Sequence, residues 1–216
     1  SRGLGDVYKR QVYALDVNDH AALAQAAADF IRHAQGIDIV IANAGISRGT
    51  LTEYAEDLQV FDQVFATNVT ATVATFSPFI PTMLAQAAAG HTACRLVGIG
   101  SVAGIRGLPG AGAYSASKSA VISYCESLRV ELKKSGIKVV TIAPGYIDTP
   151  MTQVNVYAMP FLMPVQKFAE SAVATIAAGC SYRVIPWQMG VVAKVLRVLP
   201  NWAYDFLFAN APRKKR

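Results

Sequence analysis

Three short apolar runs constrain what this 216-residue chain can fold into. They span residues 37–42, 94–100 and 137–143, and each is apolar along nearly its whole length. Strands with this pattern are buried on both faces, as in parallel sheets. We expect two more strands over residues 12–15 and 182–186, and helices over residues 21–35, 56–86, 113–134, 167–178 and 191–208. This alternation predicts an α/β fold with one doubly wound, Rossmann-like parallel sheet.

Composition and charge exclude several classes of protein. The chain is 53% hydrophobic and 16% charged, which argues against disorder. Its net charge of +6 lies at the ends: residues 1–11 hold three basic and one acidic residue, the last four residues are all basic, and 13 basic and 13 acidic residues remain between. No nucleic-acid partner is therefore expected. Three widely spaced cysteines predict a reduced, cytoplasmic protein without a metal site.

The first 11 residues have neither helical nor strand periodicity. They back-translate to a transposase adapter used in sequencing libraries, so we interpret them as adapter-derived and exclude them from the fold. The alternative is that Gly3 and Gly5 belong to a degenerate phosphate loop, which would need a preceding strand and a following helix. We expect one domain over residues 12–212 and a basic tail at residues 213–216.

The strongest catalytic pattern lies between Ser101 and Lys118. Tyr114 and Lys118 are four residues apart in a predicted helix and therefore share one face. A cation beside a phenol favours the phenolate, so such a pair can exchange a proton nearer neutral pH. Many such pairs are only a surface aromatic under a lysine stem. A serine at a strand end, followed by the Gly-rich loop 104–112, favours the catalytic interpretation because α/β proteins bind ligands at strand ends.

Other strand ends and one helix carry further candidates. The first apolar run ends in Asn43, Ala44 and Gly45, small residues that let the backbone approach a flat ligand, and Asn43 can tie neighbouring strand ends together. Asn68 is a polar residue inside an apolar helix and needs a reason to be there. Residues 146–164 are irregular and rich in proline and methionine, as in a substrate lid.

These residues, in this order, resemble the short-chain dehydrogenase/reductase family, in its single-domain branch, over about residues 12–212. The positions that match are Asp16, Val17, Asn43, Ala44, Gly45, Asn68, Ser101, Tyr114, Lys118, Pro144, Gly145 and Thr149. The resemblance implies hydride transfer between NAD or NADP and a carbonyl or alcohol. It leads us to expect an NAD(P)-dependent enzyme whose substrate is a small molecule.

The resemblance also implies a role for each matching residue. Tyr114 would be the acid in reduction and the base in oxidation, and Ser101 would hold the substrate oxygen. Lys118 would lower the pKa of Tyr114 and bind the nicotinamide ribose, while Asn68 would position a water that relays protons. The cofactor contacts implied are Asp16 and Val17 at the adenine, Asn43, Ala44 and Gly45 along the cofactor, Thr149 at the carboxamide, and Pro144, Gly145, Ile147, Tyr114 and Lys118 around the nicotinamide end. From its residues alone, Asp16 is equally well an ordinary loop carboxylate.

The chain departs from the family pattern at its beginning. We find no counterpart of the family's first βαβ unit, whose Gly-rich turn cradles the cofactor pyrophosphate at a helix N-terminus. We therefore expect the intact gene product to be the enzyme and this polypeptide to bind cofactor poorly and to be inactive. The same unit selects between cofactors, so our preference for NADP over NAD rests on family frequency alone.

The remaining apolar residues leave alternatives open. Six of them either line a substrate pocket or belong to the ordinary core: Ile105, Leu108, Met151, Met159, Phe161 and Met163. Five aromatic residues are expected either to cover the edge of the sheet or to form a subunit contact in a homo-oligomer: Trp187, Trp202, Tyr204, Phe206 and Phe208. The C-terminal segment could also lie on a membrane surface, but Lys194 and Arg197 oppose a membrane span.

Two rival functions share part of the pattern. An epimerase or dehydratase of the extended branch has the same Tyr-x-x-x-Lys spacing but a larger C-terminal domain. A non-catalytic dinucleotide-binding protein of the same fold should have lost Ser101, Tyr114 or Lys118, and all three are present.

Overall fold

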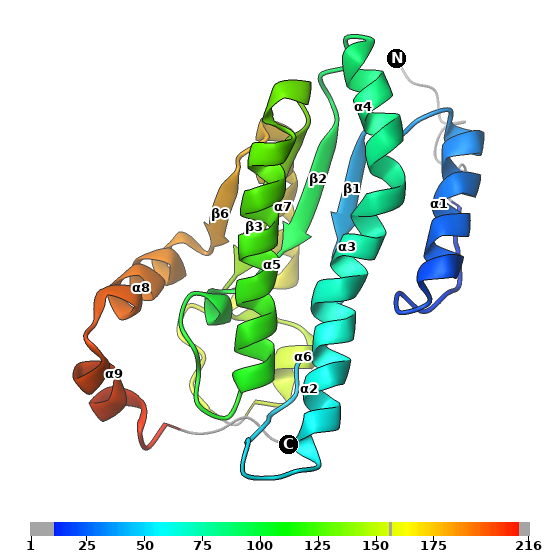
Figure 1. Ribbon diagram of the computed structural model, residues 1–216. Coiled ribbons are helices and arrows are strands. Elements are labelled where there is room, and N and C mark those ends of the chain that lie inside the picture. Colours follow the sequence, from blue (N-terminus) through cyan, green and yellow to red (C-terminus); the bar gives the residue numbers. More distant parts are fainter. Residues whose placement is uncertain (1–10, 156, 212–216) are drawn as a thin grey trace.

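A four-stranded parallel sheet forms the centre of the protein, as the computed structural model in Figure 1 shows for residues 11–155 and 157–211. The strand order is β1-β2-β3-β6. The strands are β1 (Ile39–Ala42), β2 (Arg95–Ile99), β3 (Lys138–Pro144) and β6 (Tyr182–Ile185). Ala42 is in register with Gly98, and Ile99 with Ile142. The carboxyl ends of the strands therefore lie along one edge of the sheet.

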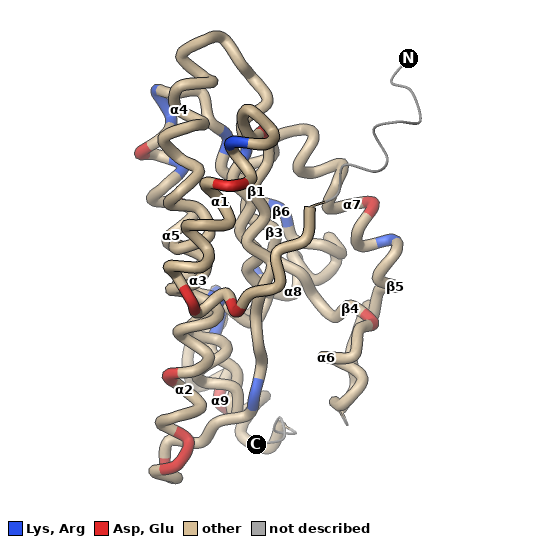
Figure 2. The backbone as a smooth tube through the Cα atoms, turned by 90° about the vertical axis from the view of Figure 1, so that its right-hand side faces the viewer, with Lys and Arg blue, Asp and Glu red and all other residues tan. Residues whose placement is uncertain are grey.

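Helices cover both faces of this sheet, which confirms the doubly wound fold (Figures 1 and 2). One face carries α5 (Gly112–Glu131) and a long helical segment over residues 57–88. The other face carries α7 (Val165–Ala178). The first helix, α1 (His20–Ala34), packs beside the long segment, where the rings of Phe30 and Phe79 lie 6.4 Å apart.

β1 departs from the expected burial on both faces, since it lies at the side of the described sheet and its Ile39 and Ile41 are 40% and 48% exposed. The core explains why the sequences of β2 and β3 are apolar without alternation. Leu96 and Val139 pack in the cluster beneath α5, whereas Val97 and Val140 pack in the cluster beneath α7. Successive residues of β2 and β3 point to opposite faces, and both faces are covered. Each strand residue at these positions therefore has to be apolar.

The segment over residues 57–88 stays helical throughout, although its hydrogen-bonding pattern changes. It contains α2 (Asp57–Phe65), a π-helical turn (Ala66–Thr70), α3 (Ala71–Phe76), a 3-10 turn (Ser77–Phe79) and α4 (Ile80–Ala88). Pro78 and Pro81 lie in the first turns of the 3-10 element and of α4, where a missing backbone donor is tolerated. The helix expected over residues 56–86 is therefore continuous, and the prolines cause only a local change of helix type.

Two sequence-based expectations are wrong. Residues 12–15 do not form a strand. β1 is the last strand on that side of the described sheet, and residues 12–15 do not pair with it or with any other described strand. Val12 is 89% exposed, and the Tyr13 hydroxyl donates to Asp29 on α1 instead. The helix expected over residues 191–208 is two helices, α8 (Trp187–Val198) and α9 (Asn201–Phe208), because Pro200 forces Leu199 into an extended conformation.

The expected irregular segment over residues 146–164 is partly ordered. It contains α6 (Pro150–Gln153) and a small parallel pair formed by β4 (Ile147–Asp148) and β5 (Met163–Pro164). This segment leaves the carboxyl end of β3 and returns to α7. It therefore lies beside the edge where the candidate site residues gather.

The loop that follows β2 packs directly on α5. It begins with a 3-10 turn (Val102–Gly104), and a Cβ atom on Gly104 would lie 2.6 Å from the carbonyl carbon of Lys118 and 2.7 Å from the amide nitrogen of Ser119. Only glycine permits this approach. By contrast, a Cβ atom on Gly107 in the same loop would meet no atom within 4 Å.

We expect Gly104→Ala to push the loop away from α5 and to lower the free energy of unfolding by about 1–3 kcal/mol, as overpacking does elsewhere. Gly107→Ala is the matched control and should stay within about 0.5 kcal/mol of the wild type. Urea unfolding followed by circular dichroism measures both. Equal stability of the two variants would contradict the proposed close packing.

Candidate active site

Ser101 and Tyr114 meet where β2 ends and α5 begins. Ser101 follows β2 in an extended conformation, and its Oγ accepts a hydrogen bond of 3.1 Å from the amide of Ala103. Tyr114 lies in the first turn of α5. Burial raises the pKa of Tyr114, and a hydrogen bond with the Ser101 side chain lowers it without cancelling the rise. Tyr114 is therefore a protonated phenol at neutral pH, held beside a second hydroxyl.

Lys118 lies one turn further along α5, and its ammonium group is almost completely buried. The side chain is 5% exposed, and Nζ donates a 2.8 Å hydrogen bond to the carbonyl oxygen of Ile99 at the end of β2. Nζ also lies 5.9 Å from the centre of the Tyr114 ring. Burial lowers the pKa of Lys118 to about 8.

The structure corrects one expectation about this pair. Lys118 was expected to bring the pKa of Tyr114 down, but in the structure the pKa of Tyr114 is raised. The reason is that burial penalises the charged form of both groups and the ammonium is directed at the Ile99 carbonyl. At neutral pH, Tyr114 is therefore in its protonated, neutral form.

Asn68 joins the loop after β1 to the catalytic helix. It is fully buried in the π-helical turn, where its Oδ1 accepts from the amide of Ile46 at 2.8 Å and its Nδ2 donates to the Ile46 carbonyl at 3.0 Å. Nδ2 also donates to Ser117 Oγ at 2.9 Å, and that hydroxyl donates to the carbonyl of Tyr114. These hydrogen bonds explain why Asn68, a polar residue, lies in an apolar helix. Its role in positioning a water that relays protons stays a prediction.

The loop after β1 passes close to Lys118. A Cβ atom on Gly45 would lie 3.2 Å from Asn68 Oδ1 and 3.4 Å from Lys118 Nζ. Asn43 and Ala44 are exposed beside it, and no hydrogen bond ties Asn43 to another strand end among the described residues. Glycine at position 45 therefore leaves room for the Asn68 amide and the Lys118 ammonium beside the loop.

The residues expected at the end of β3 reach the same edge. The amide of Gly145 donates to the Ile185 carbonyl at 2.8 Å, so Pro144 and Gly145 continue the parallel pairing. Ile147 is buried in β4, and Thr149 precedes α6, where its amide donates to Thr152 Oγ1. The sheet therefore brings the ends of β1, β2 and β3 together, as the sequence predicted.

Asp16 and Val17 reach this region by a turn instead of a strand. Asp16 is exposed, and its Oδ1 accepts from both the amide and Nδ2 of Asn18. Asn18 Nδ2 also donates to Thr67 Oγ1 at 3.3 Å, beside Asn68 in the π-helical turn. This contact holds the turn against the site although the preceding residues are unpaired.

Two adjoining cavities share Leu108, Tyr146 and Phe208, and neither is lined by Ser101, Tyr114 or Lys118. The first cavity has a volume of about 290 Å³, and its lining includes Tyr146 and Tyr157. Burial raises the pKa of Tyr157, and the negative charges of Tyr146 and Tyr114, when these are ionised, raise it further. The second, of about 260 Å³, lies between the loop after Ser101 and the C-terminal helices. Its apolar lining includes Val102, Ile105, Leu108, Met189, Leu196 and Phe208.

The cavities correct the expected pocket residues. Ile105 and Leu108 line them, but Met151 and Phe161 are 42% and 50% exposed and line neither. Sequence reasoning missed Met189 and Leu196 as lining residues. The periodicity of α8 places residues 189, 193 and 196 on one face, but the opposite face is also apolar, so the sequence does not show which face turns inward.

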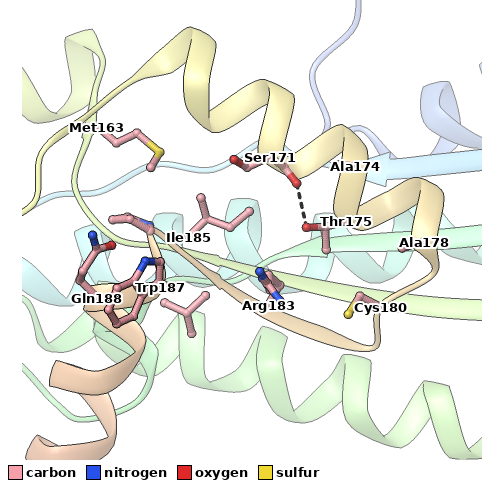
Figure 3. Close-up of a pocket in the computed structure, with 12 residues that line it drawn as sticks. Met163, Ser171, Ala174, Thr175, Ala178, Cys180, Arg183, Ile185, Trp187 and Gln188 are labelled. Atoms are coloured by element: carbon pink, nitrogen blue, oxygen red, sulfur yellow. Dashed lines mark hydrogen bonds between the residues drawn. The ribbon is translucent and has the colours of Figure 1, made fainter.

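The largest of the described cavities, of about 510 Å³, lies elsewhere, between α7, β6 and the start of α8 (Figure 3). Met163, one of the expected pocket residues, lines this cavity together with Arg183 and Trp187, whereas none of the expected catalytic or cofactor-binding residues does.

Comparisons with known proteins agree with this geometry. Residues 6–158 match the sequence model of the short chain dehydrogenase family. The chain belongs to that family. The match begins inside the segment that we interpret as adapter-derived, and that interpretation stays a prediction.

Three similar proteins give the extent of the likeness. An uncharacterized oxidoreductase of Myxococcus xanthus is 37% identical over 191 residues, which are 88% of this chain and 73% of that protein. A short chain dehydrogenase of Burkholderia cenocepacia, solved in complex with NADP, gives a TM-score of 0.75 at 23% identity and covers 92% of this chain and 77% of its own. A 3-ketoacyl-(acyl-carrier-protein) reductase of Brucella melitensis, complexed with NADH, gives 0.74 at 23% identity and covers 84% and 79%.

We expect Lys118→Met to remove a pH dependence of stability from this short chain dehydrogenase. The pKa of Lys118 is about 8 in the folded chain and 10.5 as a free group, so between these values the unfolded chain binds more protons and stability rises with pH. Between pH 8 and pH 9 the wild type should gain about 1 kcal/mol relative to the variant. Chemical unfolding at several pH values measures this gain.

Cys125 acts in the opposite direction at higher pH, but both proteins contain it, so its contribution cancels in the difference between the wild type and Lys118→Met. Burial raises the pKa of its thiol from 9.0 to about 11, so the unfolded chain loses that proton first. Lys134→Met, which removes an exposed lysine, is the control and should keep the wild-type slope. Parallel curves for the wild type and Lys118→Met would contradict the role of burial.

Proposed function

We propose that the protein is an NAD(P)-dependent oxidoreductase that transfers a hydride between the nicotinamide and a carbonyl or alcohol, with Tyr114 as acid and base. The observation that carries this proposal is the contact of Ser101 with Tyr114, one helical turn from the buried ammonium of Lys118. Proton transfer needs a donor and a stabilising hydroxyl at one oxygen atom, and these two side chains can both reach one.

The residues of the site fit the nicotinamide end of such a cofactor. Gly45 leaves room for Lys118 Nζ, and Asn43 and Ala44 beside it are exposed, so a flat group can reach the backbone of this loop near the ammonium. Lys118 uses one hydrogen bond for Ile99 and has further donors for a ribose hydroxyl. Asn43, Ala44, Pro144, Gly145, Ile147 and Thr149 would line the cofactor, and Asp16 and Val17 would meet the adenine. The bound nicotinamide supplies the hydride.

The residues of this chain then handle the proton. In reduction, Tyr114 donates its hydroxyl proton to the substrate oxygen while Ser101 donates a hydrogen bond to the same atom. The raised pKa of Tyr114 keeps this proton in place at neutral pH, which supports the reductive direction. Lys118 stabilises the phenolate that remains, and we propose that Asn68 orders the path by which the proton is replaced.

The cavities support an apolar carbonyl compound as substrate. Most residues that line the two adjoining cavities are aliphatic or aromatic, and Tyr146 and Phe208 line both. An apolar group gains free energy by leaving water for such a surface. We further propose NADP as the preferred cofactor, the cytoplasm as the location and a homo-oligomer as the working form.

Weak cofactor binding by this 216-residue chain is our next prediction. A pyrophosphate is held by glycine-rich backbone at a helix N-terminus, whereas the turn before α1 carries Asp16, Asn18 and Asp19. Carboxylates there repel phosphate. We expect dissociation constants above roughly 100 μM, far weaker than the nanomolar to micromolar range of ordinary specific sites. Calorimetric titration with NADPH and NADH checks this, and micromolar binding would contradict it.

Replacement of Tyr114 tests the proposed acid. In the intact gene product at saturating NADPH or NADH, Tyr114→Phe should lower the rate of reduction of apolar ketones and aldehydes at least about 100-fold, the usual contribution of a positioned general acid. Tyr124→Phe is the matched control on the same helix, since burial also raises its pKa, to about 12, but it packs against Phe76 in the core. Full activity of Tyr114→Phe would refute the mechanism.

A further inference from the structure

The C-terminal helices α8 and α9 are already packed against the fold by one face each. Met189 and Ala193 of α8 are about 5% exposed or less, and Tyr204 of α9 is 8% exposed. The Tyr204 hydroxyl donates to the Gly107 carbonyl, and its ring stacks on Phe208 with 4.5 Å between the ring centres. The inward faces of α8 and α9 therefore supply the contacts that pack these helices against the fold.

The outward faces of the same helices are also apolar. Trp187, Val191, Val195 and Val198 recur at helical spacing along α8 and are 67%, 53%, 52% and 80% exposed. In α9, Trp202, Phe206 and Leu207 are 76%, 84% and 58% exposed. A helix on the surface of a soluble domain normally turns polar residues to water. We call these seven exposed residues the outer C-terminal surface.

Arg106 fixes both helices in place. Its guanidinium lies 4.0 Å from the centre of the Tyr204 ring and donates to the carbonyls of Leu196 and Leu199 and to Asn201 Oδ1. These acceptors stand at the end of α8 and at the start of α9. In Figure 1 the two helices extend away from the β6 side of the sheet. The outer C-terminal surface is therefore presented by anchored helices.

The charge of the C-terminal segment of the sequence indicates what would cover this surface. Residues 187–211 contain Lys194, Arg197 and a single acid, Asp205, and the sequence continues into four basic residues at positions 213–216. The segment from Trp187 onward thus carries six basic groups and one acidic group, a net charge of +5. A second copy of this surface would bring the same positive charge. An anionic lipid surface would complement it, at about 1 kcal/mol per basic residue near the membrane.

We propose that the outer C-terminal surface docks on an anionic lipid bilayer. Trp202 and Phe206 enter the headgroup region, where indole and phenyl rings are favoured, and the basic side chains lie against lipid phosphates. This contact is peripheral: no helix among residues 11–155 and 157–211 has the length and hydropathy needed to cross a bilayer. The inward faces of α8 and α9 line the 260 Å³ cavity, so an apolar ligand of that cavity would be close to the lipid.

Flotation of the full chain with vesicles tests this proposal. One set of vesicles contains phosphatidylcholine alone, and the other contains phosphatidylcholine with phosphatidylglycerol. We expect binding to the anionic vesicles, at least about tenfold weaker binding to the neutral ones, and a decrease when salt is raised. In Trp202→Ser/Phe206→Ser, binding to the anionic vesicles should fall at least about tenfold, because the apolar contribution is lost.

Val130→Ser/Val173→Ser is the matched control. These valines are 60% and 65% exposed on α5 and α7, so this variant loses exposed apolar area elsewhere and should bind like the wild type. Thermal unfolding of each variant verifies that it folds. Equal binding of both double variants, or binding that ignores lipid charge, would overturn the proposal. A wild-type dimer that Trp202→Ser/Phe206→Ser separates, without any vesicle binding, would assign the surface to a second copy instead.

Discussion

The hydrogen bond from Lys118 Nζ to the carbonyl oxygen of Ile99 is the interaction on which the site depends. A buried ammonium is costly unless it is hydrogen-bonded, so this contact fixes the distance between α5 and the end of β2. Ser101 lies two residues beyond Ile99, and Tyr114 lies one turn before Lys118. The same short distance brings Ser101 beside Tyr114 and requires glycine at position 104, where the loop meets the helix backbone.

Asn68 performs a corresponding task on the other side of the site. Its amide group bridges Ile46, in the loop after β1, and Ser117, on α5. A buried amide with one acceptor and two donor contacts specifies a single arrangement, since each missing partner would leave a polar atom unsatisfied. The π-helical turn around Asn68 belongs to this arrangement. The ends of β1 and β2 and the helix α5 are thereby held together by two buried polar side chains, Lys118 and Asn68.

Much of this organisation could be predicted from the sequence, because it depends on local patterns. Apolar runs gave the strands of the sheet, and the spacing of Ser101, Tyr114 and Lys118 gave their proximity. Effects that depend on distant residues were not predictable in the same way. Residues 12–15 have the composition of a strand, but a strand also needs a hydrogen-bonding neighbour.

The pKa of Tyr114 was expected in the wrong direction for a similar reason. Spacing shows which groups are near, but only the packed structure shows how deeply both are buried. The break at Pro200 was readable from the proline itself. The apolar lining supplied by α8 and α9 was not, because both faces of these helices are apolar and periodicity alone does not say which one turns inward.

The position of β1 at the side of the described sheet has a consequence for the behaviour of the chain in solution. Ile39 and Ile41 are 40% and 48% exposed on this four-residue strand, and neither proline nor a charged residue within it guards its outer edge. Open strand edges with apolar side chains are templates for pairing with other extended segments. The unpaired residues 12–15 of a neighbouring molecule are such a segment. Concentrated solutions of this chain are therefore prone to edge-to-edge aggregation, which a lysine in β1 would suppress.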